Sequence, residues 1–156
     1  METCYIETPI GIAKIIGNQD GISIISIEEN HEVSTEIPVF LSDAVIQLKE
    51  YFAGKRTHFD FKITPKGTDF QNEVWKELLK IPFGKTCSYM DLSKKLGNIK
   101  AIRAVASANG KNPLWIVIPC HRVIGSDGSM TGYAGGIWRK KWLLEHENPS
   151  VQKELF

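Results

Sequence analysis

The chain has 156 residues, of which 42% are hydrophobic and 24% charged, and its formal net charge is +1. This balance is typical of a folded globular protein and excludes a disordered chain. No stretch approaches the roughly 18 consecutive apolar residues of a membrane helix, and the first residues lack the basic and apolar segments of a secretory signal. We therefore expect a cytoplasmic protein that does not enter a membrane.

Basic residues are concentrated in the second part of the chain. Residues 1–67 carry 6 Lys and Arg against 10 Asp and Glu, a net charge of −4, whereas residues 68–156 carry 13 against 8, a net charge of +5. A basic part of this kind suits a polyanionic partner, although chance scatter in composition would produce the same division. We expect an N-terminal subdomain over residues 1–67 and a second domain over residues 68–156.

The N-terminal part is predicted to form a small sheet and a helix. Turn-forming residues separate three runs of strand-like composition, which are residues 5–8, 11–16 and 21–27. This alternation of runs and turns predicts a meander. Apolar residues at helical spacing predict a helix over residues 42–52. Phe59 and Phe61 predict one more short strand, and residues 64–67 a linker.

The second part is predicted to begin with a capped helix. Thr68 and Gln71 have the spacing of a capping box, and the helix that follows keeps one face apolar as far as Ile81. Pro82 and Gly84 end it.

A helix-turn-helix pattern follows this first helix. Ser88 is suited to cap a helix over residues 89–96, and a turn containing Gly97 leads to another helix over residues 100–109. Helices joined in this way bind DNA in some proteins and pack as an ordinary hairpin in others. Arg103 stands among small residues of the last helix. It is either a solvated charge or a side chain directed at phosphate or stacked bases.

A buried strand is predicted over residues 114–118, and it ends in the sequence Pro119-Cys120-His121-Arg122-Val123. A cysteine in this position is either a small buried apolar side chain or a nucleophile. A nucleophile needs a group that removes the thiol proton, and the neighbouring histidine is the candidate. The histidine in turn needs an acidic partner, for which Glu145 and Glu147 are the local candidates.

The three cysteines, Cys4, Cys87 and Cys120, are odd in number and lack CxxC spacing, so we expect neither a disulfide framework nor a zinc site.

The sequence around Cys120 resembles the O6-alkylguanine-DNA alkyltransferases, also called methylated-DNA–protein-cysteine methyltransferases. The residues that carry this resemblance are the five-residue sequence 119–123 together with residues 84–96, 103–112, 132–136 and 142–147. The resemblance is strong over residues 68–148 and holds only in outline before them. It implies an α+β architecture. A small N-terminal α/β subdomain resembling ribonuclease H would precede a mainly helical domain with a winged-helix-like helix-turn-helix.

The resemblance implies direct-reversal DNA repair by irreversible, single-turnover transfer of the alkyl group from O6-alkylguanine to Cys120. Activity on O4-alkylthymine is left open. The damaged nucleotide would be flipped out of the duplex. His121 would act as base through a water molecule, and Glu147 would orient it. Tyr89 would donate a proton to N3 of guanine, and Asn112 would hold the turn that bears the cysteine.

The resemblance also assigns a DNA-binding set and a substrate pocket. Arg103 would occupy the space left by the flipped base. The expected DNA contacts are Arg103, Tyr89, Ser88, Ala104, Lys100, Lys111 and Arg122. The expected pocket residues are Val123, Tyr133, Ala134, Gly135 and Asn109, with backbone groups reading the base edges.

Double-stranded DNA carrying O6-alkylguanine is the expected partner, bound through its minor groove by a monomer without a cofactor. Relatives that bind zinc near the N-terminus use two Cys and two His, whereas here Cys4 is the only cysteine in that part, so we expect no zinc. Two other functions remain open. One is a damage sensor that flips the base without transfer; the other is a thiol hydrolase that uses Cys120, His121 and Glu147.

Overall fold

The computed structural model describes residues 1–130, 133 and 135–149. The chain forms two compact units. The first contains Met1–Lys66 and Pro113–Val117, and the second contains Gly67–Asn112 and the residues from Ile118 onward. A five-residue segment from the second part of the sequence therefore belongs to the first unit.

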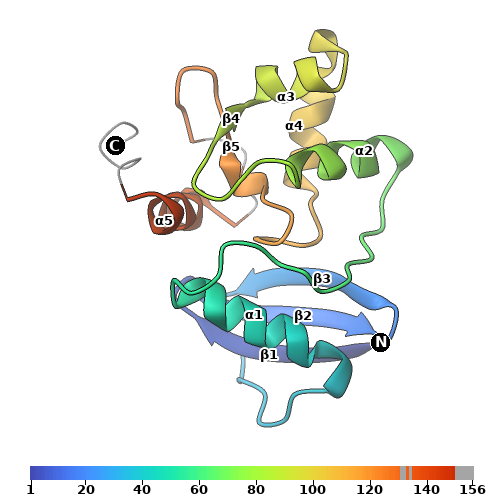
Figure 1. Ribbon diagram of the computed structural model, residues 1–156, viewed down its shortest axis with the longest axis vertical. Helices are drawn as coiled ribbons and strands as arrows, with labels where there is room; N and C mark the ends of the chain where they lie inside the picture. The colour runs from blue at the N-terminus through green and yellow to red at the C-terminus, as the bar shows by residue number, and fades with distance from the viewer. Residues whose placement is uncertain (131–132, 134, 150–156) are drawn as a thin grey trace. The chain divides into compact units, whose positions relative to one another are not determined.

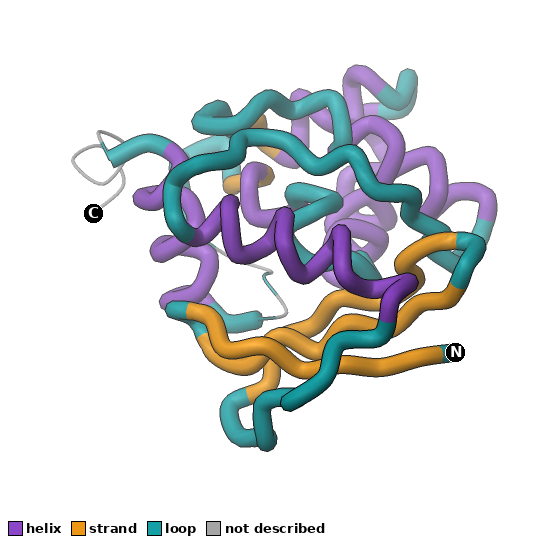
Figure 2. The backbone as a smooth tube through the Cα atoms, turned by 60° about the horizontal axis from the view of Figure 1, so that its bottom comes forward, coloured by secondary structure: helices purple, strands orange, loops and turns teal. Residues whose placement is uncertain are grey.

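The first unit is a three-stranded antiparallel sheet with one helix. The strands β1 (Glu2–Thr8), β2 (Gly11–Asn18) and β3 (Gly21–Glu28) lie in chain order, as the predicted meander requires. A 3₁₀ turn, η1 (Val39–Leu41), leads into α1 (Ser42–Phe52), which lies along the sheet (Figures 1 and 2). Buried residues alternate along β2 and β3, so one face of the sheet supplies the core beneath the helix.

The strand predicted at Phe59 and Phe61 is absent from the described structure. In its place, Ile63 forms a single parallel bridge with Ile22. The Phe59 ring lies 5.5 Å from that of Tyr51 and 5.9 Å from that of Phe61. These aromatic residues therefore pack side chain to side chain, and both Phe59 and Phe61 are half-buried without strand pairing.

The strand predicted over residues 114–118 is also wrong. Only Leu114 pairs with the sheet, through hydrogen bonds from Ile25 N to Pro113 O (2.9 Å) and from Trp115 N to Ile25 O (3.0 Å). Ile116 then has φ +75°, and Val117 N donates to Trp115 O (2.8 Å) in a tight turn. The apolar composition of this segment marks burial, which a turn can satisfy as well as a strand.

Three helices form the body of the second unit. They are α2 (Asp69–Leu78), α3 (Tyr89–Lys95) and α4 (Ile102–Gly110), the last preceded by the 3₁₀ turn η2 (Ile99–Ala101). The capping box is confirmed, because Thr68 accepts from Gln71 N and Gln71 accepts from Thr68 N. Trp75 connects α2 to α4, because its indole Nε1 donates a hydrogen bond to Ala108 O (2.9 Å).

A two-residue parallel pairing joins the helix-turn-helix to the cysteine-bearing segment. The strand β4 (Cys87–Ser88) immediately precedes α3, and β5 (Val123–Ile124) immediately follows the 3₁₀ turn η3 (Cys120–Arg122). The last helix is α5 (Ile137–Glu147). Helices with a small appended β pairing agree with the expected winged-helix-like arrangement, and the whole chain is α+β (Figure 1). Across the described ranges, no helix has the length and apolar character needed to cross a membrane.

Candidate active site

Cys120 lies at the start of η3 and is 4% exposed. Its backbone N–H donates to Ile118 O (2.8 Å), which closes a tight turn after Pro119. Burial raises the pKa of the thiol to about 11, while a hydrogen bond from Asn112 and the charge of Lys140 act in the opposite direction. The unliganded site therefore favours the thiol, and a nucleophilic role requires a base.

His121 supplies a buried imidazole beside the cysteine. Its Nε2 lies 2.7 Å from Oε2 of Glu147, and both side chains are almost completely buried. Burial lowers the pKa of His121, Glu147 raises it, and Arg122 and Lys140 lower it again, so the ring is neutral near pH 7. Nδ1 is buried and has no hydrogen-bond partner among the described residues. A neutral ring that donates from Nε2 keeps the lone pair of Nδ1 for a proton.

The carboxylate of Glu147 is ionised despite its burial. Burial alone would raise its pKa, but His121 and Arg122 together hold it well below the usual value. Arg122 makes two hydrogen bonds to it, from Nε to Oε1 (2.7 Å) and from Nη2 to Oε2 (3.0 Å). Of the two acidic candidates from the sequence, the structure therefore brings Glu147 to the histidine and leaves Glu145 exposed.

Two asparagines support the turn that carries the cysteine. Asn112 donates from Nδ2 to Ile118 O (2.7 Å), two residues before Cys120. Asn109 is 1% exposed, and its Nδ2 lies 3.5 Å from both Cys120 O and the hydroxyl of Tyr89. The end of α4 is thereby connected to the cysteine and to the first residue of α3.

Tyr89 is brought to the site by the β4–β5 pairing, which places Ser88 beside Ile124. Burial raises the pKa of its hydroxyl, and the neighbouring Cys120 raises it further, so the phenol keeps its proton at neutral pH. Ser88 serves as the N-cap of α3, accepting from Asp91 N (3.0 Å).

The expected pocket residues are found only in part. Val123 is fully buried, and burial raises the pKa of the Tyr133 hydroxyl well above its usual value. Gly135 O accepts from Nη1 of Arg139 (3.0 Å). Ala134 lies outside the described residues.

Lys140 is a buried charge that the sequence did not reveal. Its side chain is 0% exposed, and Nζ donates to Val123 O (2.6 Å). Burial lowers its pKa to about 8, opposed by the nearby Cys120. Lys140 stands between Arg139 and Lys141, and no local sequence pattern distinguishes it from solvated basic residues.

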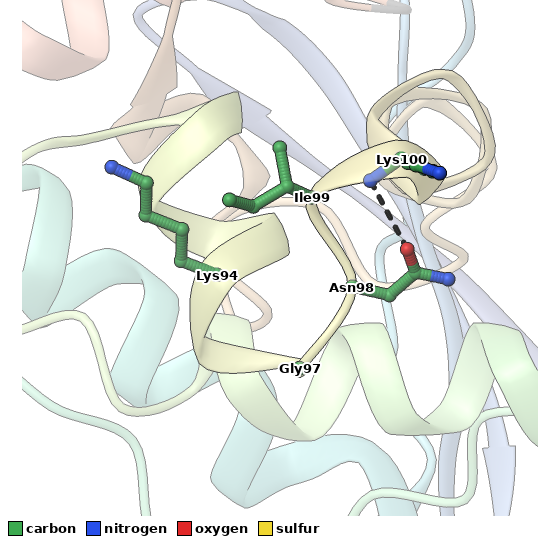
Figure 3. A pocket seen from close by; sticks show the side chains of 5 residues that line it. All are labelled: Lys94, Gly97, Asn98, Ile99 and Lys100. Carbon is green, nitrogen blue, oxygen red and sulfur yellow. Dashed lines mark hydrogen bonds between the residues drawn. The ribbon is translucent and has the colours of Figure 1, made fainter.

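The exposed part of the helix-turn-helix carries the expected DNA contacts. Arg103 and Ala104 on α4 are exposed, as are Lys100 on η2 and Lys111 after α4. Figure 3 shows the turn between α3 and η2, where Asn98 caps the backbone N–H of Lys100 (3.0 Å) and the Ile99 side chain lies between those of Lys94 and Lys100. Cationic side chains therefore flank the exposed turn between α3 and η2.

Arg122 does not lie where the DNA-binding set requires it. It is 6% exposed, and besides its two bonds to Glu147 its Nη1 donates to Ile81 O (2.6 Å). Burial and three hydrogen bonds to protein oxygens hold the guanidinium inside the second unit, so we no longer propose Arg122 as a DNA contact. The partners that hold the Arg122 side chain are 25 and 41 residues away in the sequence, so no local sequence pattern indicates its burial.

The other two cysteines lie in strands. Cys4 is buried in β1 of the first unit, and Cys87 is half-buried in β4. Within the described residues, no three His, Cys, Asp or Glu side chains gather so as to hold a metal ion.

A helix-turn-helix joined to a buried cysteine, a neutral histidine and an ionised glutamate defines a DNA-binding protein with a candidate thiol nucleophile. Two family descriptions match the chain: the 6-O-methylguanine DNA methyltransferase ribonuclease-like domain over residues 2–65, and the DNA binding domain of the same name over residues 69–149. The chain therefore belongs to the 6-O-methylguanine DNA methyltransferase family.

Individual relatives agree with this assignment. The methylated-DNA–protein-cysteine methyltransferase of Methanosarcina barkeri is 44% identical over 154 residues, covering 94% of this chain and 97% of its own. The crystal structure of the Mycobacterium tuberculosis O6-methylguanine methyltransferase has a TM-score of 0.85 and 45% identity, covering 95% of this chain and 93% of its own. A crystal structure of the M. tuberculosis protein in complex with DNA has a TM-score of 0.87 and 44% identity, covering 96% and 94%.

Proposed function

We propose that Cys120 is the alkyl acceptor of this DNA-repair methyltransferase and takes the alkyl group from O6 of guanine in DNA. The class is direct-reversal repair, as the family descriptions and the names of the relatives indicate. The observation that carries the assignment to Cys120 is the buried hydrogen bond of 2.7 Å between His121 and Glu147, directly beside the cysteine. A non-catalytic sensor would not need this pair.

The reaction forms a bond from the Cys120 sulfur to the alkyl carbon and breaks the bond from that carbon to O6. The thiol proton passes to Nδ1 of His121, either directly or through water, and Glu147 stabilises the imidazolium that results. The departing guanine needs a proton, because it is a poor leaving group as an anion. Tyr89 donates it to N3 and regains one from the imidazolium.

The product is a thioether, which is chemically inert, and the proposed set contains no group that would remove it. We therefore expect each molecule to act once. Val123, Tyr133, Ala134 and Gly135 would enclose the flipped base, and Asn109 and Asn112 would hold the acceptor in place.

The helix-turn-helix would bind the minor groove of damaged duplex DNA. Arg103 and Ala104 on the exposed side of α4, together with Lys100, Lys111 and Ser88, would contact the duplex, mostly its phosphates. The crystallised complex of the M. tuberculosis relative with DNA supports DNA as the partner. We propose that the protein binds as a monomer, in the cytoplasm and without a cofactor or metal.

The test is the intact mass of the native chain after incubation with a duplex that contains one O6-methylguanine. We expect a gain of about 14 Da, one methyl group replacing one hydrogen, at one equivalent per chain. Peptide mapping should place the group on Cys120 and not on Cys4 or Cys87. Tight lesion binding without any mass gain would identify a sensor, and turnover of an ester without DNA would identify a hydrolase.

Arg103→Ala should slow transfer from a lesion in duplex DNA by about 10- to 100-fold, because the helix loses the side chain that offsets the unstacking energy of the flipped nucleotide. Transfer from the same lesion in single-stranded DNA should change little. The measurement is the single-turnover rate on both substrates at saturating protein.

Lys100→Ala is the matched control for Arg103→Ala, because it removes a neighbouring exposed cation. It should weaken binding and reduce the salt slope of affinity by about 1, with equal effect on transfer from both substrates at saturation. An equal loss on single-stranded and duplex substrates in Arg103→Ala would contradict a role in flipping.

A further inference from the structure

The carboxylate of Glu147 is surrounded by donors on both oxygens. Oε2 accepts from His121 Nε2 (2.7 Å) and from Arg122 Nη2 (3.0 Å), while Oε1 accepts from Arg122 Nε (2.7 Å) and from Gly84 N (3.4 Å). The side chains of His121, Glu147 and Arg122 are 0%, 1% and 8% exposed. The histidine therefore shares its acidic partner with a guanidinium, and water screens neither interaction.

Arg122 also contacts two residues that follow α2. Its Nη1 donates to Ile81 O (2.6 Å), and its guanidinium carbon lies 5.9 Å from the centre of the Phe83 ring. The residues just after α2 thus fix the plane of the guanidinium, which presents two donors to the carboxylate. This fork geometry is a property of arginine that lysine cannot reproduce.

The charges around the imidazole determine whether His121 is protonated. The groups that face His121 are Glu147 and Lys140 from α5 and Arg122 from its own turn. A buried carboxylate paired with the histidine alone would draw a proton onto the ring and form an imidazolium-carboxylate pair. With Arg122 already paired to the carboxylate, a protonated ring would add an uncompensated positive charge to a buried cluster that also contains Lys140.

We propose that Arg122 is a positioning residue for the transfer reaction, which keeps Glu147 ionised and His121 neutral, so that Nδ1 can accept the thiol proton at neutral pH. The proposal rests on the proposed function, because it concerns the base of that reaction. It replaces the DNA-contact role that the sequence suggested for Arg122.

The test compares the pH dependence of the single-turnover transfer rate between pH 5 and 9 in Arg122→Gln and Glu147→Gln. Loss of the guanidinium should raise the pKa of His121, so the acid limb of the Arg122→Gln profile should move up by about one pH unit or more. On the steep acid part of the profile, below the native midpoint, its rate should fall about tenfold, and it should recover at high pH. Loss of the carboxylate in Glu147→Gln should move the acid limb to lower pH and reduce the maximal transfer rate. The proposal would be overturned if the acid limbs of the two variants shift in the same direction, or if neither limb shifts.

Two additional measurements separate this role from a merely structural one. Arg122→Lys keeps the charge and loses the fork, so its acid limb should stay near the native position while its plateau falls. It also serves as the test if Arg122→Gln does not fold. Nitrogen NMR of His121 in the native chain at pH 7 should show a neutral ring protonated at Nε2, and an imidazolium there would contradict the proposal.

The control is Arg56→Gln, which breaks an arginine-glutamate contact of 3.1 Å in the first unit, and it should leave the profile unchanged. Affinity for undamaged duplex DNA should be the same in Arg122→Gln and in the native chain. A reduced affinity with a smaller salt slope would instead make Arg122 a phosphate contact. Absence of mass gain in the native chain would contradict the proposed function, whereas the NMR result tests the role of Arg122 independently of transfer.

Discussion

Cys120→Ser should gain no mass from O6-methylguanine DNA under conditions in which the native chain is fully modified. A serine hydroxyl is a far weaker nucleophile than a thiol at neutral pH, and His121 would have to remove a proton held much more tightly. The fold should persist, because oxygen replaces sulfur in a side chain of the same shape. The measurement is intact mass, together with near-UV circular dichroism as a check of folding.

Cys87→Ser and Cys4→Ser are the controls for this variant, since they remove the other two thiols. Both should gain one methyl group. Cys120→Ser should still bind the damaged duplex with nearly native affinity, measured by fluorescence anisotropy, because it removes none of the expected DNA contacts. A mass gain in Cys120→Ser would show that the acceptor is another residue.

Glu147→Ala should destabilise the protein by about 3–5 kcal/mol, because it leaves the buried Arg122 guanidinium without its carboxylate. Transfer should also fall to the limit of detection, since His121 loses its hydrogen-bond acceptor. Urea denaturation at pH 7 measures the free energy of unfolding, and single-turnover kinetics measures the transfer.

The contribution of Glu147 to stability also has a predictable pH dependence. The pKa of Glu147 is lowered in the folded state, so its contribution is fully present above the unfolded-state value of about 4.3. It is lost as the pH falls from there toward the folded-state pKa. The stability difference between the native chain and Glu147→Ala should therefore shrink below about pH 4.

Glu77→Ala is the matched control, because Glu77 forms a contact of 3.1 Å with the exposed Lys80 at the end of α2. It should change the unfolding free energy by less than about 1 kcal/mol. Comparable losses in both variants would mean that the buried cluster contributes no more than an ordinary surface pair.

Local sequence patterns were sufficient for much of the fold. The meander, the helix at residues 42–52 and the capping box at Thr68 each depend on residues close together in the chain, so their propensities were visible. The same locality explains the two false strands. Apolar residues at Phe59 and Phe61 and at residues 114–118 indicate partial or full burial. Only contacts with distant segments decide whether such residues pair in a strand, form a turn or pack through their side chains.

The candidate site was predicted by resemblance more than by local chemistry. Cys120 and His121 are adjacent, but Glu147 is 26 residues beyond the histidine, and nothing in the spacing selects it over Glu145. Lys140 and Arg122 were missed or misassigned for the same reason. A basic residue is normally solvated, and its burial becomes visible only when the carbonyl or carboxylate that receives it is located.

The segment Pro113–Val117 belongs to the first unit, which limits how the protein can be divided into fragments that fold. A fragment that begins at Thr68 would retain the cysteine, the glutamate, α2 and both helices of the helix-turn-helix. It would also carry Leu114 without the β3 residue Ile25 that pairs with it, exposing an apolar segment three residues before the reactive turn. Proteolysis at the 64–67 linker should therefore yield halves that remain associated, and a recombinant C-terminal half should be prone to aggregate unless the N-terminal half is supplied as a separate chain.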